Sequence, residues 1–153
     1  MKQHCPYCES ALPDPAKVSK PRSLDQHRRF FGLVRAAHFH WPETHPMQFT
    51  SEQDLRKWLT AKAGWRDIAA RIPITSMNPD RLKWIAEAAF KAAGADAFPQ
   101  VHKGELIIWV PRSIRFDRMP HLEFCTLNDA VEHAIQQETG LRADDLLKES
   151  ATA

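Results

Sequence analysis

Hydrophobic side chains near the start of the chain recur at the spacing of a helix. One helical face would carry the apolar side chains of Phe30, Val34, Ala37 and Trp41. Ser23, with Gln26 three residues later, forms a capping-box pattern that satisfies backbone N–H groups at a helix start. Pro42 cannot continue the helix. The pattern therefore predicts a first helix from Ser23 to Trp41.

Three further stretches show helical periodicity, and each is followed by a glycine that suits a helix end. They predict helices over residues 51–63, 79–93 and 120–139. The helix at 79–93 has Asn78 as its cap and Pro79 at its first position. It is expected to bury a stripe made of Leu82, Ile85, Ala86, Ala89 and Ala93. Residues 141–153 are expected to add only a short turn of helix.

Strand signals occupy the middle of the chain. Residues 105–110 are rich in β-branched and aromatic side chains, and Lys103-Gly104 predicts a turn that joins them to a strand at 98–102. A short edge strand is expected at 71–74, where Pro73 cannot donate to a sheet. These elements predict an α+β fold, mainly helical, with about four helices and a small β-sheet or hairpin. Residues 1–21, rich in proline, are expected to form an N-terminal extension of a single domain at 22–153.

Composition limits the classes of function. The chain has 153 residues, of which 43% are hydrophobic and 26% charged, as in ordinary globular proteins. The longest apolar run is far shorter than the ~18 residues of a membrane span. The polar N-terminus lacks a signal-peptide pattern, so a cytoplasmic location is expected. Residues 1–75 carry 12 basic and 7 acidic side chains (+5), and residues 76–153 carry 9 and 12 (−3), which favours a basic surface on the N-terminal half.

Cys5 and Cys8 have the spacing of half a zinc knuckle. Two more ligands are needed, and the sequence offers three sources: His121 with Cys125, His38 with His40, or the same cysteines of a second protomer. An inert extension and redox chemistry are the alternatives to zinc. Cys5 and Cys8 are therefore candidate metal ligands, and zinc is the candidate cofactor.

Cations and aromatic rings occur together along the first two predicted helices. Single-stranded DNA binders need cations for the phosphates and flat rings for the bases. The candidate DNA contacts in this part of the chain are Gln26, Arg28, Arg29, Arg35, Lys57, Lys62 and Trp65. Gly32 would keep the face between Arg28 and Arg35 flat for a sugar-phosphate chain. A second basic cluster follows the predicted strand and adds Arg112 and Arg115 as candidates.

Two segments carry a resemblance to known proteins. The stretch Arg22-Ser23-Leu24-Asp25-Gln26-His27-Arg28, followed by an apolar helix, resembles the core of NinB-type (Orf) phage recombination proteins. Residues 110–119 with 122–124 resemble related uncharacterised prophage proteins. Arg22, Ser23, Gln26 and Arg28 match the NinB-type motif, whereas His27 stands where asparagine is common. The resemblance implies single-stranded DNA binding, a homodimer, contact with host single-strand-binding protein, and Arg22 as a further DNA contact.

No catalytic signature is present: the chain has no Walker loop, no Gly-x-Ser-x-Gly and no His-Glu-x-x-His. The first hypothesis is a non-catalytic phage or prophage accessory protein that binds single-stranded DNA in recombination or replication, with no membrane partner. The alternative is a phage-encoded interaction protein that inhibits or redirects a host machine. A metal-dependent nuclease is the third interpretation.

Overall fold

The structure is a computed structural model that describes residues 24–114 and 119–152. Within these residues it contains five helices and one three-stranded antiparallel sheet, so the predicted α+β class is confirmed. No helix in this part of the chain has the length and apolarity needed to cross a bilayer. The fold divides into two compact units, residues 1–59 with 113–153 and residues 60–112. The single domain predicted over residues 22–153 stays a prediction, because compactness does not measure independent folding.

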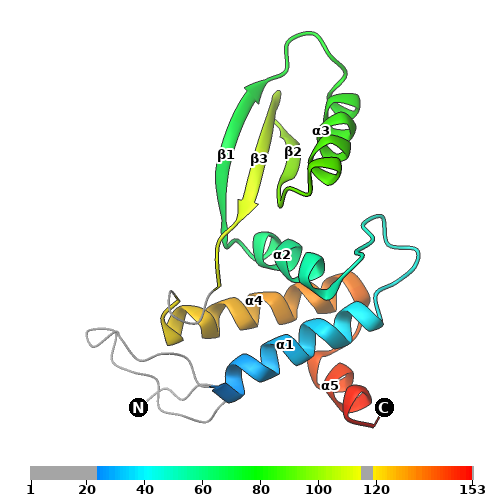
Figure 1. The fold of residues 1–153 in the computed structure, drawn as a ribbon, viewed down its shortest axis with the longest axis vertical. Coiled ribbons are helices and arrows are strands. Elements are labelled where there is room, and N and C mark those ends of the chain that lie inside the picture. Colours follow the sequence, from blue (N-terminus) through cyan, green and yellow to red (C-terminus); the bar gives the residue numbers. More distant parts are fainter. Residues whose placement is uncertain (1–23, 115–118, 153) are drawn as a thin grey trace. The chain divides into compact units, whose positions relative to one another are not determined.

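Unit 1 is helical. Helices α1 (Leu24–Phe39) and α4 (His121–Thr139) run in the same direction, and α5 (Ala143–Thr152) packs against both (Figure 1). The predicted stripe of α1 is buried at Phe30, Val34 and Ala37. The Phe30 ring contacts the ring of Phe124 on α4, 5.3 Å between centroids. Apolar side chains of α4 are buried at Phe124, Leu127, Val131 and Ile135. The periodicity read from the sequence therefore identified the core of this unit.

The ends of the chain's helices differ from the predictions in two places. Helix α1 ends at Phe39, so Trp41 lies beyond the helix and is half-buried. The expected short turn near the C-terminus is a helix of 10 residues, α5. Leu146 of α5 is buried, and a Cβ added at Gly32 would meet Leu147 Cδ2 at 3.8 Å. Gly32 thus lies beside α5, and the flat open face expected there is partly covered.

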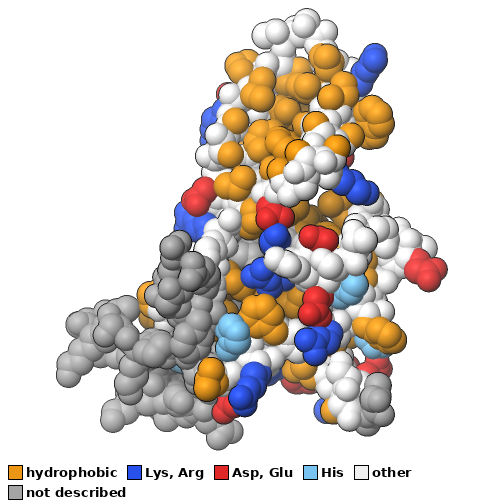
Figure 2. Space-filling model, in the orientation of Figure 1, with side chains coloured by type: hydrophobic (Ala, Val, Ile, Leu, Met, Phe, Trp, Pro, Cys, Tyr) orange, Lys and Arg blue, Asp and Glu red, His pale blue; other side chains and the backbone are white. Residues whose placement is uncertain are grey.

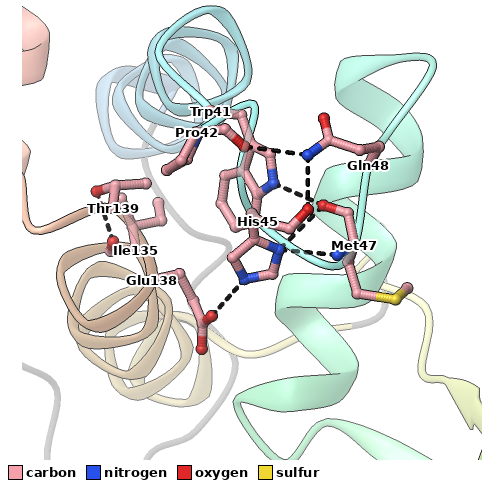
Figure 3. A network of polar contacts seen from close by, with 8 residues as sticks. All are labelled: Trp41, Pro42, His45, Met47, Gln48, Ile135, Glu138 and Thr139. Carbon is pink, nitrogen blue, oxygen red and sulfur yellow. Dashed lines mark hydrogen bonds and ion pairs between the residues drawn. The ribbon is translucent and has the colours of Figure 1, made fainter.

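The loop between α1 and α2 (Glu52–Lys62) is attached to α4 by a polar network (Figure 3). His45 Nε2 lies 2.6 Å from Glu138 Oε2, and the Met47 backbone N–H donates to His45 Nδ1 at 3.0 Å. The Trp41 indole N–H donates to the carbonyl oxygen of Met47 at 2.9 Å. Since a carboxylate oxygen can only accept, His45 Nε2 is the donor of the hydrogen bond to Glu138. The network therefore fixes both the imidazole and the loop.

Unit 2 contains the sheet, in the order β1-β3-β2, and helix α3 (Pro79–Ala93). Strands β2 (Phe98–His102) and β3 (Glu105–Pro111) form the predicted hairpin. Both turn residues have positive φ, 46° at Lys103 and 77° at Gly104, as a two-residue hairpin turn requires. Strand β1 (Arg66–Pro73) starts before the predicted edge strand and is an edge strand, as Pro73 indicated.

Helix α3 confirms the predicted ends but not the predicted burial. The Asn78 side chain accepts from the backbone N–H groups of Asp80 and Arg81, and Gly94 closes the helix with a φ of 63°. None of its residues is fully buried. Ile85, Ala89 and Ala93 of the expected buried stripe are exposed, because one small sheet covers only a narrow side of the helix. Next to them Trp84 is 67% exposed.

Candidate nucleic-acid interface

One face of the sheet in unit 2 combines rings, cations and amide groups. Residues directly opposite in an antiparallel pair point to the same side. Phe98 and Ile68 both lie opposite Trp109, and Gln100 lies opposite Ile107. Alternation along the strand puts Arg66 on the same side as Ile68. Arg71 lies opposite Ile107 and therefore also belongs to this side. We call this surface the Trp109 face; its members are Arg66, Ile68, Arg71, Phe98, Gln100 and Trp109, with Ile107 buried at 4% exposure.

The Trp109 indole is fixed from two directions. The Arg66 guanidinium carbon lies 3.9 Å from the ring centroid, well within the range of a cation–π contact. The indole N–H donates to Gln100 Oε1 at 3.1 Å. The ring therefore has a set orientation before any ligand arrives, which lowers the entropy cost of binding. A planar guanidinium stacked on an indole is also a surface on which a nucleic-acid base can stack.

The cations of α1 face carboxylates. Arg29 is mostly buried and pairs with Glu132 at 2.6 Å and Asp144 at 3.4 Å, so it holds α4 and α5 to α1. Arg35 Nε lies 3.1 Å from Glu52 Oε2, and both side chains are exposed. Exposed pairs of this kind contribute only about 0–1 kcal/mol, so a phosphate can compete for the arginine.

Arg28 is the most open of these predicted contacts. Its side chain is 76% exposed, and its Nη1 lies 3.8 Å from Oδ1 of Asp25, which is itself exposed. Arg28 and Arg35 lie two helical turns apart, and both are exposed. They remain candidate phosphate contacts of unit 1, whereas the two carboxylate partners of Arg29 give that side chain a structural role.

Gln26 requires a correction, because its side chain is 0% exposed. Its amide nitrogen donates to Cys125 Sγ at 2.9 Å, inside unit 1. A side chain held in this position does not reach a DNA chain on the surface. The motif match at Gln26 therefore reports on packing, and the sequence could not show this because Cys125 lies 99 residues away.

The remaining predicted contacts are distributed over both units. The Arg112 backbone N–H donates to the Trp65 carbonyl oxygen at 2.9 Å, and Arg112 Nε lies 2.8 Å from Asp67 Oδ1. In the strand register Asp67 lies opposite Val110, on the side of the sheet that faces away from the Trp109 ring. Arg112 therefore lies on that other side and is not part of the Trp109 face. Lys57 is half-buried on α2, and Lys62 is exposed at its end. Four predicted site residues lie outside the described residues: Arg22, Arg115, Cys5 and Cys8.

Sequence reasoning missed Arg66 and Trp109 as site residues, although part of the signal was present. The predicted two-residue turn at Lys103-Gly104 already fixes the register that puts Phe98 opposite Trp109. The approach of Arg66 depends on the pairing of β1 with β3, 43 positions apart in the sequence (109 − 66). A long-range strand pairing leaves no local pattern.

In the described part of the chain, no group of three or more His, Cys, Asp or Glu side chains is arranged to hold a metal ion. The chemistry of the Trp109 face is stacking and charge attraction, which suits binding. A comparison with protein-family models returned no match to this chain, and neither did searches of curated proteins and of solved structures.

Proposed function

We propose that this protein binds single-stranded DNA through the Trp109 face, without catalysing a reaction on it. The observation that carries the proposal is the stack of Arg66 on Trp109, 3.9 Å from guanidinium to ring, in line with Phe98 across the strands. Aromatic rings with adjacent cations on a sheet are a common platform for unpaired bases. The phage setting, a role in recombination or replication and contact with host single-strand-binding protein are proposed from the NinB-type resemblance.

We expect Trp109→Ala to weaken binding of a single-stranded oligonucleotide by about 1–3 kcal/mol, since one stacking platform is lost. Arg66→Ala should also reduce the slope of log affinity against log salt by about 0.7 for one lost phosphate contact. Fluorescence anisotropy of a labelled oligonucleotide at several salt concentrations measures both quantities.

The matched control is Trp84→Ala, which removes an exposed tryptophan from α3 in the same unit. It should leave affinity and salt slope unchanged. If Trp109→Ala binds as tightly as the parent with the same slope, the Trp109 face is not the DNA surface. Arg28→Ala combined with Arg35→Ala would then test unit 1.

A second candidate function, a protein-binding role directed at a host machine, is favoured by exposed apolar side chains in unit 2. Met77, Trp84 and Ile85 are all exposed, and hydrophobic side chains gather over this unit in the view of Figure 2. Exposed apolar patches often mark protein interfaces. Binding to such a partner would be weakened by Trp84→Ala and would depend little on salt, in contrast to binding of DNA.

The proposed homodimer has a direct test. The chain has a mass of 17.5 kDa, so light scattering at micromolar concentration should give twice that mass. Trp84→Glu should lower the mass to that of the monomer if α3 forms the dimer contact, because a buried carboxylate without a partner is strongly unfavourable. A monomer in the unmodified protein would contradict the dimer and weaken the NinB-type assignment.

A further inference from the structure

Helix α3 is apolar on two opposite faces. The face that packs on the sheet carries half-buried apolar residues one turn apart, namely Leu82, Ala86 and Phe90. The opposite face, which we call the outer α3 face, carries exposed apolar residues at helical spacing, namely Trp84, Ile85, Ala88 and Ala92. Figure 2 shows hydrophobic side chains gathered over this unit. A surface helix normally turns charged and polar residues to solvent, so the outer α3 face indicates a further contact.

The size of the side chains changes along the outer α3 face. Trp84 is 67% exposed and Ile85 is 40% exposed, and both lie in the first half of the helix. Ala88 lies near the middle of the helix, and Ala92 lies in its last turn. Bulky side chains at one end and methyl groups at the other fit a second copy of the same helix in the opposite direction. Each indole then packs on the small residues of the other copy.

A two-fold axis at Ala88 gives this fit in detail. Trp84 and Ala92 each lie four positions from Ala88, so Trp84 of one copy lies opposite Ala92 of the other. The methyl groups at the axis allow the helices to approach to about 8 Å, the lower end of the usual range. Arg81 reaches the far end of the second helix, closed at Gly94, where the helix dipole favours a cation.

Charged side chains at one edge of the outer α3 face give independent support. Glu87 and Lys91 are four residues apart and therefore lie on the same edge of the helix. About an axis at Ala88, Glu87 of one copy and Lys91 of the other differ by two positions, about 3 Å along the helix. This attractive contact forms twice in the dimer. Two helices in the same direction would instead bring Glu87 beside Glu87.

We propose that two copies of this chain associate through antiparallel α3 helices, with Ala88 at the two-fold axis and Glu87 paired with Lys91 of the second copy. The inference rests on the proposed homodimer and does not depend on DNA binding. One pair of helices makes a smaller contact than the about 800 Å² per partner of a standard interface, so we expect a dissociation constant in the micromolar range. The chain is then monomeric at the nanomolar concentrations of an oligonucleotide titration, where Trp84→Ala stays a control.

The test is sedimentation equilibrium over a range of micromolar concentrations, where the mass should rise from 17.5 kDa toward twice that value. Glu87→Lys brings like positive charges together at both contacts, and Lys91→Glu brings like negative charges together. Each variant alone should raise the dissociation constant about tenfold. Lys103→Glu makes the same charge change at an exposed turn of the same unit and should leave the dissociation constant unchanged. Circular dichroism checks that the variants keep their helices.

An equimolar mixture of Glu87→Lys and Lys91→Glu restores opposite charges at both contacts. Its dimer formation should therefore return to that of the unmodified protein, and weakened variants that do not recover on mixing would overturn the antiparallel contact. A dimer with the same dissociation constant in both variants would keep the homodimer and exclude this face as its contact. A monomer at every concentration would overturn the homodimer and this contact together, and the oligonucleotide titration would still decide DNA binding by itself.

Discussion

Replacing Phe30 with alanine is expected to lower the unfolding free energy of the protein by about 3–5 kcal/mol, the usual cost of removing a buried phenyl ring. Phe30 is 1% exposed, and its ring packs at an angle on Phe124, 5.3 Å between centroids. The substitution leaves a cavity between α1 and α4 that the surrounding helices cannot fill. Denaturant unfolding followed by circular dichroism measures the loss.

Phe39→Ala is the matched control, because it makes the same change on the same helix at a side chain that is 84% exposed. It should cost under about 0.5 kcal/mol. Similar losses for the two variants would mean that α1 does not pack on α4 as described. If Phe30→Ala also abolishes DNA binding while Phe39→Ala does not, the effect belongs to folding and carries no information on the interface.

The predictions that held are those in which one local pattern decides the structure. The i, i+4 spacing of Phe30 and Val34 identifies the buried side of α1, whatever packs against it. Asn78 and Gly94 set the ends of α3 through backbone hydrogen bonds that involve only neighbouring residues. The turn at Lys103-Gly104 likewise fixes the hairpin register by itself.

The predictions that failed depend on what an element meets in space. The apolar stripe of α3 has the pattern of a buried helix, yet Ile85 is 40% exposed because the sheet is only three strands wide. Gln26 reads as a polar surface residue and is buried, because Cys125 on another helix accepts its hydrogen bond. In both cases the deciding partner is distant in sequence, so local periodicity cannot reveal it.

The candidate site depends on distant partners in the same way. The sequence analysis places most candidate DNA contacts on the first two helices, because cations and aromatic rings lie close together there in the sequence. The structure gives Arg29 and Arg35 carboxylate partners, from Glu132 and Glu52. The best-defined pair of cation and ring, Arg66 with Trp109, is formed by strand pairing. The pairing of β1 with β3 brings these two residues together, and no local sequence pattern shows it.

Trp41→Ala is expected to cost about 3 kcal/mol, at the low end of the range for a large aromatic residue, because the ring is only half-buried. Trp41 lies after the end of α1 and packs edge-on against Phe49 at 5.3 Å and Trp58 at 5.9 Å. Each such pair contributes about 0.5–1.5 kcal/mol beyond its buried area. Removing the indole also deprives the Met47 carbonyl oxygen of its donor.

Trp41→Phe separates the two contributions. It keeps an aromatic ring in the cluster and removes the N–H that donates to Met47 at 2.9 Å, so it should cost about 1 kcal/mol. Trp84→Ala, at an exposed tryptophan, controls for the change in tryptophan fluorescence and should leave stability unchanged within about 0.5 kcal/mol.

The loop is also held by the hydrogen bond of His45 to Glu138. The loss of stability in the double variant Trp41→Ala with Glu138→Ala should therefore differ from the sum of the two single losses. Strict additivity would mean that the aromatic cluster and the His45–Glu138 hydrogen bond hold the loop independently. A negligible loss in Trp41→Ala would contradict the attachment of the loop shown in Figure 3.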